Sequence, residues 1–259
     1  MATYNKRGYK APKPEDAKVE NDFEEVIDVS DSTTAEVFNT LDATASRTED
    51  WVAKNQKLIL TVVGVIALAT LGYVLYTKFI VEPKEEKATN EIFQSQQYFQ
   101  QAVDATTKPD SLYNLALKGG EGKLGFVGIA EEYAGTDAGN LANYYAGISY
   151  LNTGDYKNAI AYLEKFKSED AVLKPLAIGA IGDALSETNK VDDAIAHYKK
   201  AAEASENDFT TPRFMFKAAQ LLVASGKKAE ANALFVAIKE KYETSKEGMN
   251  IDVYIAMTE

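Results

Sequence analysis

The chain contains one stretch in which apolar residues cover every side of a helix. From Leu58 to Tyr76 it reads LILTVVGVIALATLGYVLY, 19 positions without a charge, bounded by Lys57 and Lys78. At about 1.5 Å per residue this helix is about 28 Å long, close to the roughly 30 Å hydrocarbon core of a bilayer. A core helix would show a polar face, and a cleaved signal sequence would begin nearer the N-terminus. We therefore predict a transmembrane helix over residues 58–78, in contact with the lipid bilayer.

Polar residues dominate before this span. Residues 1–57 carry 8 Lys and Arg against 12 Asp and Glu, with few large apolar side chains. This composition buries too little apolar surface to offset the entropy lost on ordering, so it predicts a disordered acidic tail. Two patterns within it favour helix. Thr33 and Glu36 have the spacing of a capping box, and Thr48 is placed to cap a second helix that continues into the membrane.

The basic residues beside the span leave its orientation open. Three lie within about fifteen residues of each end, namely Arg47, Lys54 and Lys57 before it and Lys78, Lys84 and Lys87 after it. The positive-inside rule therefore gives a tie. Four more basic residues at the extreme N-terminus favour a cytoplasmic N-terminus: Lys6, Arg7, Lys10 and Lys13.

After the span, residues 79–259 place apolar side chains at helical spacing throughout. No run of alternating β-branched residues reaches the length of a strand, so we predict an all-α fold class. The expected units are degenerate helical hairpins over 88–134, three repeats over about 140–173, 175–209 and 212–245, and a capping helix over 250–257. The capping helix is expected because the end of a repeat stack must be covered.

The three repeats align on their turns and on small residues. The turn residues Gly154, Asn189 and Gly226 follow one another at intervals of 35 and 37 positions. Seven positions before each turn stands a small residue that lets the first helix approach the second: Gly147, Gly182 or Ala219. Glycine and asparagine suit the left-handed backbone of such a turn.

This pattern resembles the tetratricopeptide repeat family, whose period is about 34 residues, over about residues 140–241. The copies depart from the family at the fourth position, which is usually aromatic and is here Asn143, Ile178 or Met215, and each lacks the terminal proline. The resemblance implies an α-solenoid that binds polypeptides in a concave groove lined by the first helix of each repeat.

Transferred to this chain, the family's groove positions include seven residues that we take as the candidate peptide-binding groove: Leu141, Tyr144, Ile148, Asp183, Arg213, Phe216 and Gln220. The same transfer adds five more positions: Leu151, Leu176, Gly179, Ser186 and Val223. The apolar and aromatic first copy suits a polypeptide with hydrophobic side chains. The alternative is that Leu141, Ile148 and Leu151 pack against neighbouring helices.

Composition excludes several other functions. The formal net charge of −11 has the wrong sign for a protein that binds nucleic acid. The chain has no cysteine and 1 histidine, His197, which stands beside no Ser or Asp motif. The loop Gly120–Gly125 spells G-x-G-x-x-G, but a dinucleotide site needs a preceding strand, and Leu124 stands where a Walker loop needs Ser or Thr. We therefore expect no enzyme, no metal, no cofactor and no small-molecule substrate.

The order of tail, span and repeats, together with the stretch EEYAGTDAGNLANYYAGISYLNTGDYKNAIAYLEKF, resembles the YfgM-like ancillary subunits of the SecYEG translocon, in particular their Bacteroidota-type versions. The long acidic tail departs from the short N-terminus of the proteobacterial type. The resemblance implies a bacterial inner-membrane protein with a cytoplasmic N-terminus and periplasmic repeats. There it would act with SecYEG and periplasmic chaperones in the handover of translocated proteins.

Three alternatives remain open from the sequence. The protein could be a scaffold of another envelope complex, in outer-membrane assembly, secretion or cell-division coordination. It could be an enzyme or regulator that uses the glycine-rich loop. It could also have the inverted topology, with its repeats in the cytoplasm.

Overall fold

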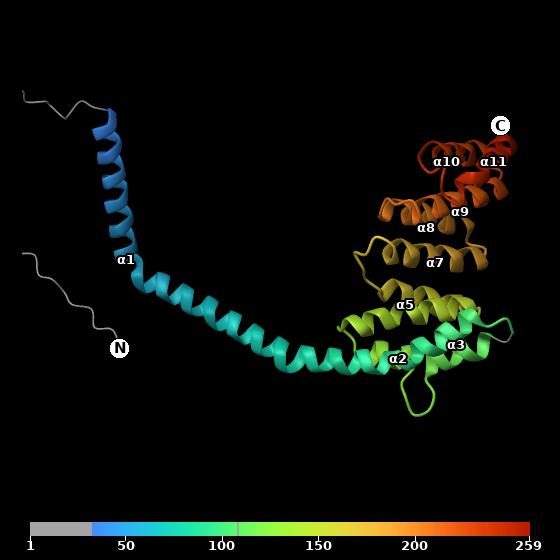
Figure 1. Cartoon of the computed structure of the whole chain (residues 1–259), viewed down its shortest axis with the longest axis horizontal. Coiled ribbons are helices and arrows are strands. Elements are labelled where there is room, and N and C mark those ends of the chain that lie inside the picture. The colour runs from blue at the N-terminus through green and yellow to red at the C-terminus, as the bar shows by residue number, and fades with distance from the viewer. Residues whose placement is uncertain (1–32, 108) are drawn as a thin grey trace, which may run out of the picture. The chain divides into compact units, whose positions relative to one another are not determined.

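A computed structural model describes residues 33–107 and 109–259 (Figure 1). Every regular element within these ranges is a helix, so the predicted all-α fold class is confirmed. The chain divides into two units, one that ends at Ala69 and one that begins at Thr70.

The first unit consists, in its described part, of one long helix that continues into the second. Helix α1 (Thr33–Tyr76) is followed without a break by the π-helical segment η2 (Thr77–Val81) and by α2 (Glu82–Asp104). Of the predicted disordered tail, residues 1–32 lie outside the described residues, whereas 33–57 are helical. No glycine or proline interrupts the sequence from 33 to 63, so the two helices expected within the tail merge with the span.

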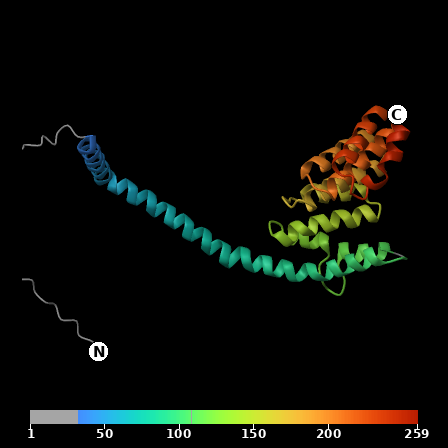
Figure 2. The same cartoon turned by 45° about the horizontal axis from the view of Figure 1, so that its top comes forward.

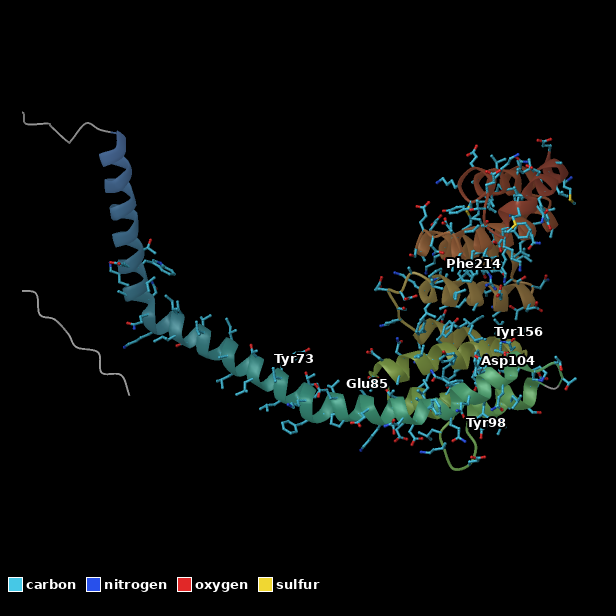
Figure 3. The ribbon with its side chains drawn as sticks, in the orientation of Figure 1. Tyr73, Glu85, Tyr98, Asp104, Tyr156 and Phe214 are labelled. Atoms are coloured by element: carbon cyan, nitrogen blue, oxygen red, sulfur yellow. The ribbon has the colours of Figure 1, made fainter. Side chains whose placement is uncertain are left out.

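The apolar side chains of this helix are exposed. Among the described residues, one helical stretch, Trp51–Asp104, is long and apolar enough to cross a membrane. Leu60 is 63% exposed and Leu68 is 71% exposed, and Figure 3 shows the side chain of Tyr73 projecting from the same helix. Contacts within the chain therefore do not account for the hydrophobicity of this helix.

The helix does not end at residue 78, where the sequence predicted the end of the span. Over η2 the backbone widens to a π turn, and the N–H of Glu82 donates to the carbonyl oxygen of Thr77, five residues earlier. Pro83 then lies in the first turn of α2. The missing N–H of a proline costs no helical hydrogen bond in a first turn, so the helix passes this residue.

The second unit continues as helical pairs that stack along the chain (Figure 2). Its helices are α3 (Pro109–Lys118), α4 (Phe126–Glu132), α5 (Asp137–Asn152), α6 (Tyr156–Lys165), α7 (Leu173–Glu187), α8 (Val191–Ala204), α9 (Thr210–Ala224) and α10 (Lys228–Lys241). A short 3-10 turn, η3 (Gly248–Asn250), leads into α11 (Ile251–Thr258). Helices α5, α7 and α9 pack against α6, α8 and α10 respectively, and α7 also contacts both α5 and α9.

Turns and small residues set the geometry of these pairs as the sequence predicted. Gly154, Asn189 and Gly226 have positive φ angles of 79°, 59° and 75°. A Cβ on Gly147 would lie 2.5 Å from Cγ of Leu163, and one on Gly182 would lie 2.7 Å from Cε1 of Tyr198. The prediction that small residues let the first helix approach the second is confirmed at these two positions.

The start of α2 is tied to the first repeat. The carboxylate of Glu85, labelled in Figure 3, accepts hydrogen bonds from the backbone N–H groups of Asp137 (2.7 Å) and Ala138 (2.9 Å) at the start of α5. Lys84 donates to the carbonyl oxygen of Ala134 at 3.0 Å. Because a carboxylate is favourable at the positive end of a helix dipole, Glu85 fixes the start of α5 against α2.

Candidate functional site

The predicted groove residue Asp183, in the middle of α7, is the centre of a polar network. The hydroxyl of Tyr198 in α8 donates to Asp183 Oδ1 at 2.6 Å. The ammonium group of Lys217 in α9 donates to the same oxygen, also at 2.6 Å, and it lies 5.5 Å from the centre of the Tyr198 ring. Burial, together with the hydrogen bond to Asp183, raises the pKa of the Tyr198 phenol. One carboxylate thus joins three helices of two successive repeats.

A depression of about 530 Å³ opens beside this network. It is lined by residues of five consecutive helices: Leu151, Asn152, Tyr156, Asp183, Ser186, Glu187, Tyr198 and Lys217. Asp183 and Lys217 each keep 30% of their side-chain surface exposed. The hydroxyl of Tyr156 donates to Glu187 Oε2 at 3.4 Å. The depression therefore offers both donors and acceptors to a bound molecule.

The two hairpins that form this depression also match known protein families. Residues 141–170, which hold α5 and α6, and residues 177–208, which hold most of α7 and α8, each match a model of the tetratricopeptide repeat. These hairpins are tetratricopeptide repeats. A comparison with curated proteins gave no match to the chain.

The matched family has a direct meaning for function. Tetratricopeptide repeats are protein–protein interaction modules, and neither of the matched models describes a catalytic family. In such stacks each repeat contacts only its neighbours, which leaves one continuous concave surface along the first helices for a partner. Here the first helices are α5, α7 and α9.

In the first tetratricopeptide repeat, the predicted groove residues are only partly available. Leu141 is half-buried against the core formed by α2 to α5, whereas Tyr144 and Ile148 are half-buried against the core around α7. The ring of Tyr144 lies 5.2 Å from that of Phe166. Burial raises the pKa of the Tyr144 phenol, and the charge of Arg213 in α9 partly offsets this rise. Predicted groove residues of the first and third repeats therefore lie on a common side of the stack.

The third hairpin, α9 and α10, divides its predicted groove residues between two surroundings. The guanidinium carbon of Arg213 lies 5.9 Å from the ring centre of Phe214, and Gln220 is exposed. The ring of Phe216 packs instead against Phe235 at 5.7 Å and against Tyr254 of α11 at 4.8 Å. Phe216 thus belongs in part to the core that joins the last repeat to α11.

One groove position of the tetratricopeptide pattern is filled from within the protein. A Cβ on Gly179 would lie 1.9 Å from Cε1 of Phe214. Phe214, labelled in Figure 3, is 2% exposed and occupies the space that a side chain at residue 179 would need. Gly179 therefore serves the contact between α7 and α9 and presents no side chain to a partner.

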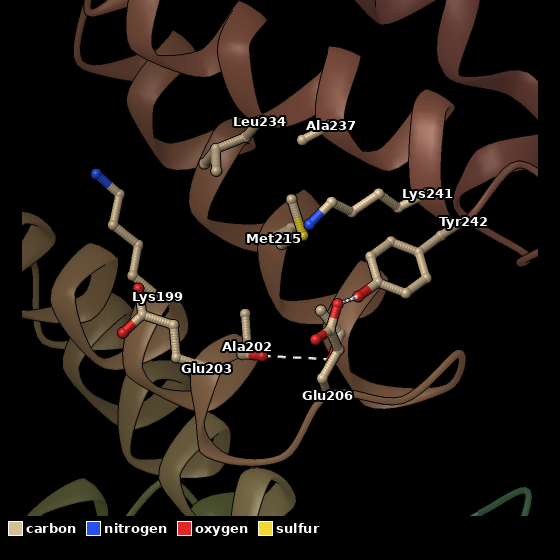
Figure 4. Close-up of a pocket in the computed structure, with 10 residues that line it drawn as sticks. Lys199, Ala202, Glu203, Glu206, Met215, Leu234, Ala237, Lys241 and Tyr242 are labelled. Atoms are coloured by element: carbon tan, nitrogen blue, oxygen red, sulfur yellow. Dashed lines mark hydrogen bonds between the residues drawn. The ribbon is translucent and has the colours of Figure 1, made fainter.

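A second cavity, of about 410 Å³, lies between α8, α9 and α10 (Figure 4). Its apolar lining includes Met215 and Leu234, and Tyr242 donates to Glu206 Oε1 at 3.0 Å on its wall. Burial, followed by the hydrogen bond to Glu206, raises the pKa of the Tyr242 phenol. The sequence gave no sign of this cavity, because its residues come from three helices and share no motif.

The residues weighed as signs of chemistry lie in ordinary structural positions. The glycine-rich loop lies between α3 and α4, and Lys123 within it forms an ion pair with Glu91 at 2.9 Å. His197 Nδ1 lies 2.9 Å from the carbonyl oxygen of Asp193, one helical turn earlier. Within residues 33–107 and 109–259, no group of three or more His, Cys, Asp or Glu is arranged to hold a metal ion.

Proposed function

We propose that this protein is a non-catalytic, membrane-tethered module that binds polypeptides along α5, α7 and α9. The observation that carries the proposal is the depression around Asp183, which lies on tetratricopeptide repeats and exposes charged and polar groups beside the half-buried apolar residue Leu151. An apolar wall next to hydrogen-bonding groups suits a peptide, whose side chains and backbone require both.

The tether in this proposal is the exposed apolar helix. Residues 58–78 act as the membrane-spanning segment, and residues 79–259 form the repeat domain on one side of the bilayer. The basic cluster near the N-terminus favours a cytoplasmic start, and it is this cluster rather than the flanking lysines that supports periplasmic repeats.

We further propose that the protein is an ancillary subunit of the Sec translocon in the bacterial inner membrane. In this role its repeats would receive segments of translocated proteins and hand them to periplasmic chaperones. The support is the resemblance of residues 131–166 to the YfgM-like proteins and the matching order of tail, span and repeats. SecYEG and periplasmic chaperones are the partners that this role requires.

Purification of the full chain in mild detergent, followed by identification of the proteins that come with it, tests the partner. Recovery of SecY supports the translocon role. Enrichment of an outer-membrane assembly, secretion or cell-division complex without SecY would replace that role with the alternative of another envelope scaffold.

Protease treatment of spheroplasts tests the orientation separately. Digestion of the repeat domain from outside is the expected result. Protection of the repeats, with cleavage after the membrane is opened, would place them in the cytoplasm and end the proposal of periplasmic handover.

A further inference from the structure

The depression around Asp183 contains one negative charge that lacks an ionic partner. Asp183 is neutralised by Lys217 at 2.6 Å and by the hydroxyl of Tyr198. Glu187, one helical turn further along α7, is exposed and accepts only a long hydrogen bond of 3.4 Å from Tyr156. None of the ion pairs between described residues involves Glu187. The charge of the depression is therefore carried by this carboxylate.

Apolar side chains lead directly to this charge. Tyr144, Ile148 and Leu151 follow one another along α5 at spacings of four and three residues, which places them on one helix face. The last of them, Leu151, lines the same depression as Glu187 and Tyr156. An apolar group of a ligand at Leu151 would thus have an anionic carboxylate beside it.

The charge of the whole repeat domain has the same sign. From Ala88 to the last residue, 17 Lys and Arg stand against 24 Asp and Glu, a net charge of 17 − 24 = −7. A domain of this sign attracts cationic partners over distances of about a Debye length, roughly 8 to 10 Å at physiological ionic strength.

Resting on the proposed function, we infer that the groove selects polypeptide segments in which a Lys or Arg side chain stands next to a large apolar one. The apolar side chain lies against Leu151, and the cationic group pairs with Glu187. The Asp183–Lys217 pair remains intact on binding, with the second carboxylate oxygen of Asp183 and the remaining N–H groups of Lys217 turned to the peptide backbone.

Peptide binding to the full-length protein in detergent tests this selection. The probes are three fluorescent Leu- and Ser-rich peptides that are identical except for a central Lys, Gln or Glu. Because an exposed ion pair changes affinity modestly, we expect the Lys peptide to bind about 2- to 5-fold more tightly than the Gln peptide and the Glu peptide to bind most weakly. This order should flatten as salt is added.

The deciding variant is Glu187→Gln, which keeps the shape of the side chain and removes its charge. It is expected to bind the three peptides nearly equally. The matched control is Glu164→Gln, which removes an exposed carboxylate of α6 that does not line the depression and should keep the preference for Lys.

The possible results separate this inference from the proposal on which it rests. Equal binding of all three peptides by the unchanged protein, or an unchanged preference in Glu187→Gln, would overturn the selection while polypeptide binding stands. Failure of every peptide to bind, with helical content intact by circular dichroism, would overturn both.

Discussion

The long helix before the repeats and the repeat stack itself use the same apolar residues in opposite ways. Leu68 in α1 is 71% exposed, whereas Leu163 in α6 is 2% exposed. In the repeats, apolar residues occupy the helix faces that meet a neighbouring helix, but in residues 58–76 they cover every side. The comparison teaches that hydrophobic content does not decide burial within the protein. A helix that is apolar all round needs an apolar solvent, which a bilayer supplies.

Charging the span should break the comparison with the largest effect. The double variant Val65→Arg with Leu68→Arg places two guanidinium groups near the middle of the apolar stretch. Each costs about 2.5 to 3.5 kcal/mol at the centre of a membrane helix, so the pair costs about 5 to 7 kcal/mol. We expect most of the protein to leave the membrane fraction after an alkaline carbonate wash.

The matched control for this loss is Val65→Ala with Leu68→Ala, which shortens the same side chains without adding charge and should stay in the membrane fraction. Full retention of the charged variant would show that something other than this helix holds the protein at the membrane.

A methyl group added at a glycine should affect the two regions unequally. Gly179→Ala drives a Cβ into the ring of Phe214, 1.9 Å from its Cε1 atom, whereas a Cβ on Gly64 in α1 meets nothing within 4 Å. Overpacking of a core costs about 1 to 3 kcal/mol, so denaturant unfolding followed by circular dichroism should show this loss for Gly179→Ala. Gly64→Ala should show no loss.

A second substitution identifies the cause of the Gly179→Ala effect. Phe214→Leu makes room for the added methyl group, so the double variant should be more stable than the sum of the two single effects predicts. Simple additivity would mean that the two residues do not interact as the structure shows.

The sequence predicted those features of the repeats that depend on a single hairpin. The positive φ of Asn189 and the close approach at Gly147 follow from local turn chemistry and from the size of one side chain. Features that join two repeats were missed. Lys217 reaches back to Asp183, and Phe214 fills the place of a side chain at Gly179, a position that the family pattern assigns to the groove. Such contacts depend on how one hairpin is rotated onto the next, and no repeat period encodes that rotation.

The helix boundaries before the repeats show the same limit. Composition predicted no stable structure for residues 33–57, yet these residues are helical up to the span. A helix that already exists can be extended residue by residue without a new nucleus, because nucleation is the costly step. The apolar stretch supplies that nucleus, and a compositional rule applied to the tail alone does not include it.

The tie between α2 and α5 gives a smaller effect within the second unit. Glu85→Ala removes the acceptor of two backbone N–H groups at the start of α5. Loss of such a cap costs about 1 to 2 kcal/mol, and hydrogen exchange at the amides of Asp137 and Ala138 should become faster. The neighbouring variant Glu86→Ala removes an exposed carboxylate and should leave both amides protected. Equal effects of the two variants would assign the protection to general charge rather than to the cap.

The smallest effect is a pH dependence at the start of α7. The carboxylate of Asp170 accepts hydrogen bonds from the N–H groups of Val172 and Leu173, both at 2.8 Å. These bonds hold the pKa of Asp170 below its ordinary value of 3.8. A lowered pKa in the folded state means that the unfolded chain takes up the proton first as pH falls. The stabilisation is therefore fully present above about pH 4 to 5 and is lost as the pH falls through the lowered value.

The melting temperature of Asp170→Ala should therefore lie below that of the unchanged protein at neutral pH, and the gap should narrow in acid. Asp170→Asn is the matched control, because its amide oxygen still accepts both hydrogen bonds but does not titrate. Its melting temperature should carry no contribution from this titration, so the difference from the unchanged protein shrinks or reverses as Asp170 becomes protonated. A gap between Asp170→Ala and the unchanged protein that stays constant into strong acid would show that the hydrogen bonds at the start of α7 do not depend on the charge of this carboxylate.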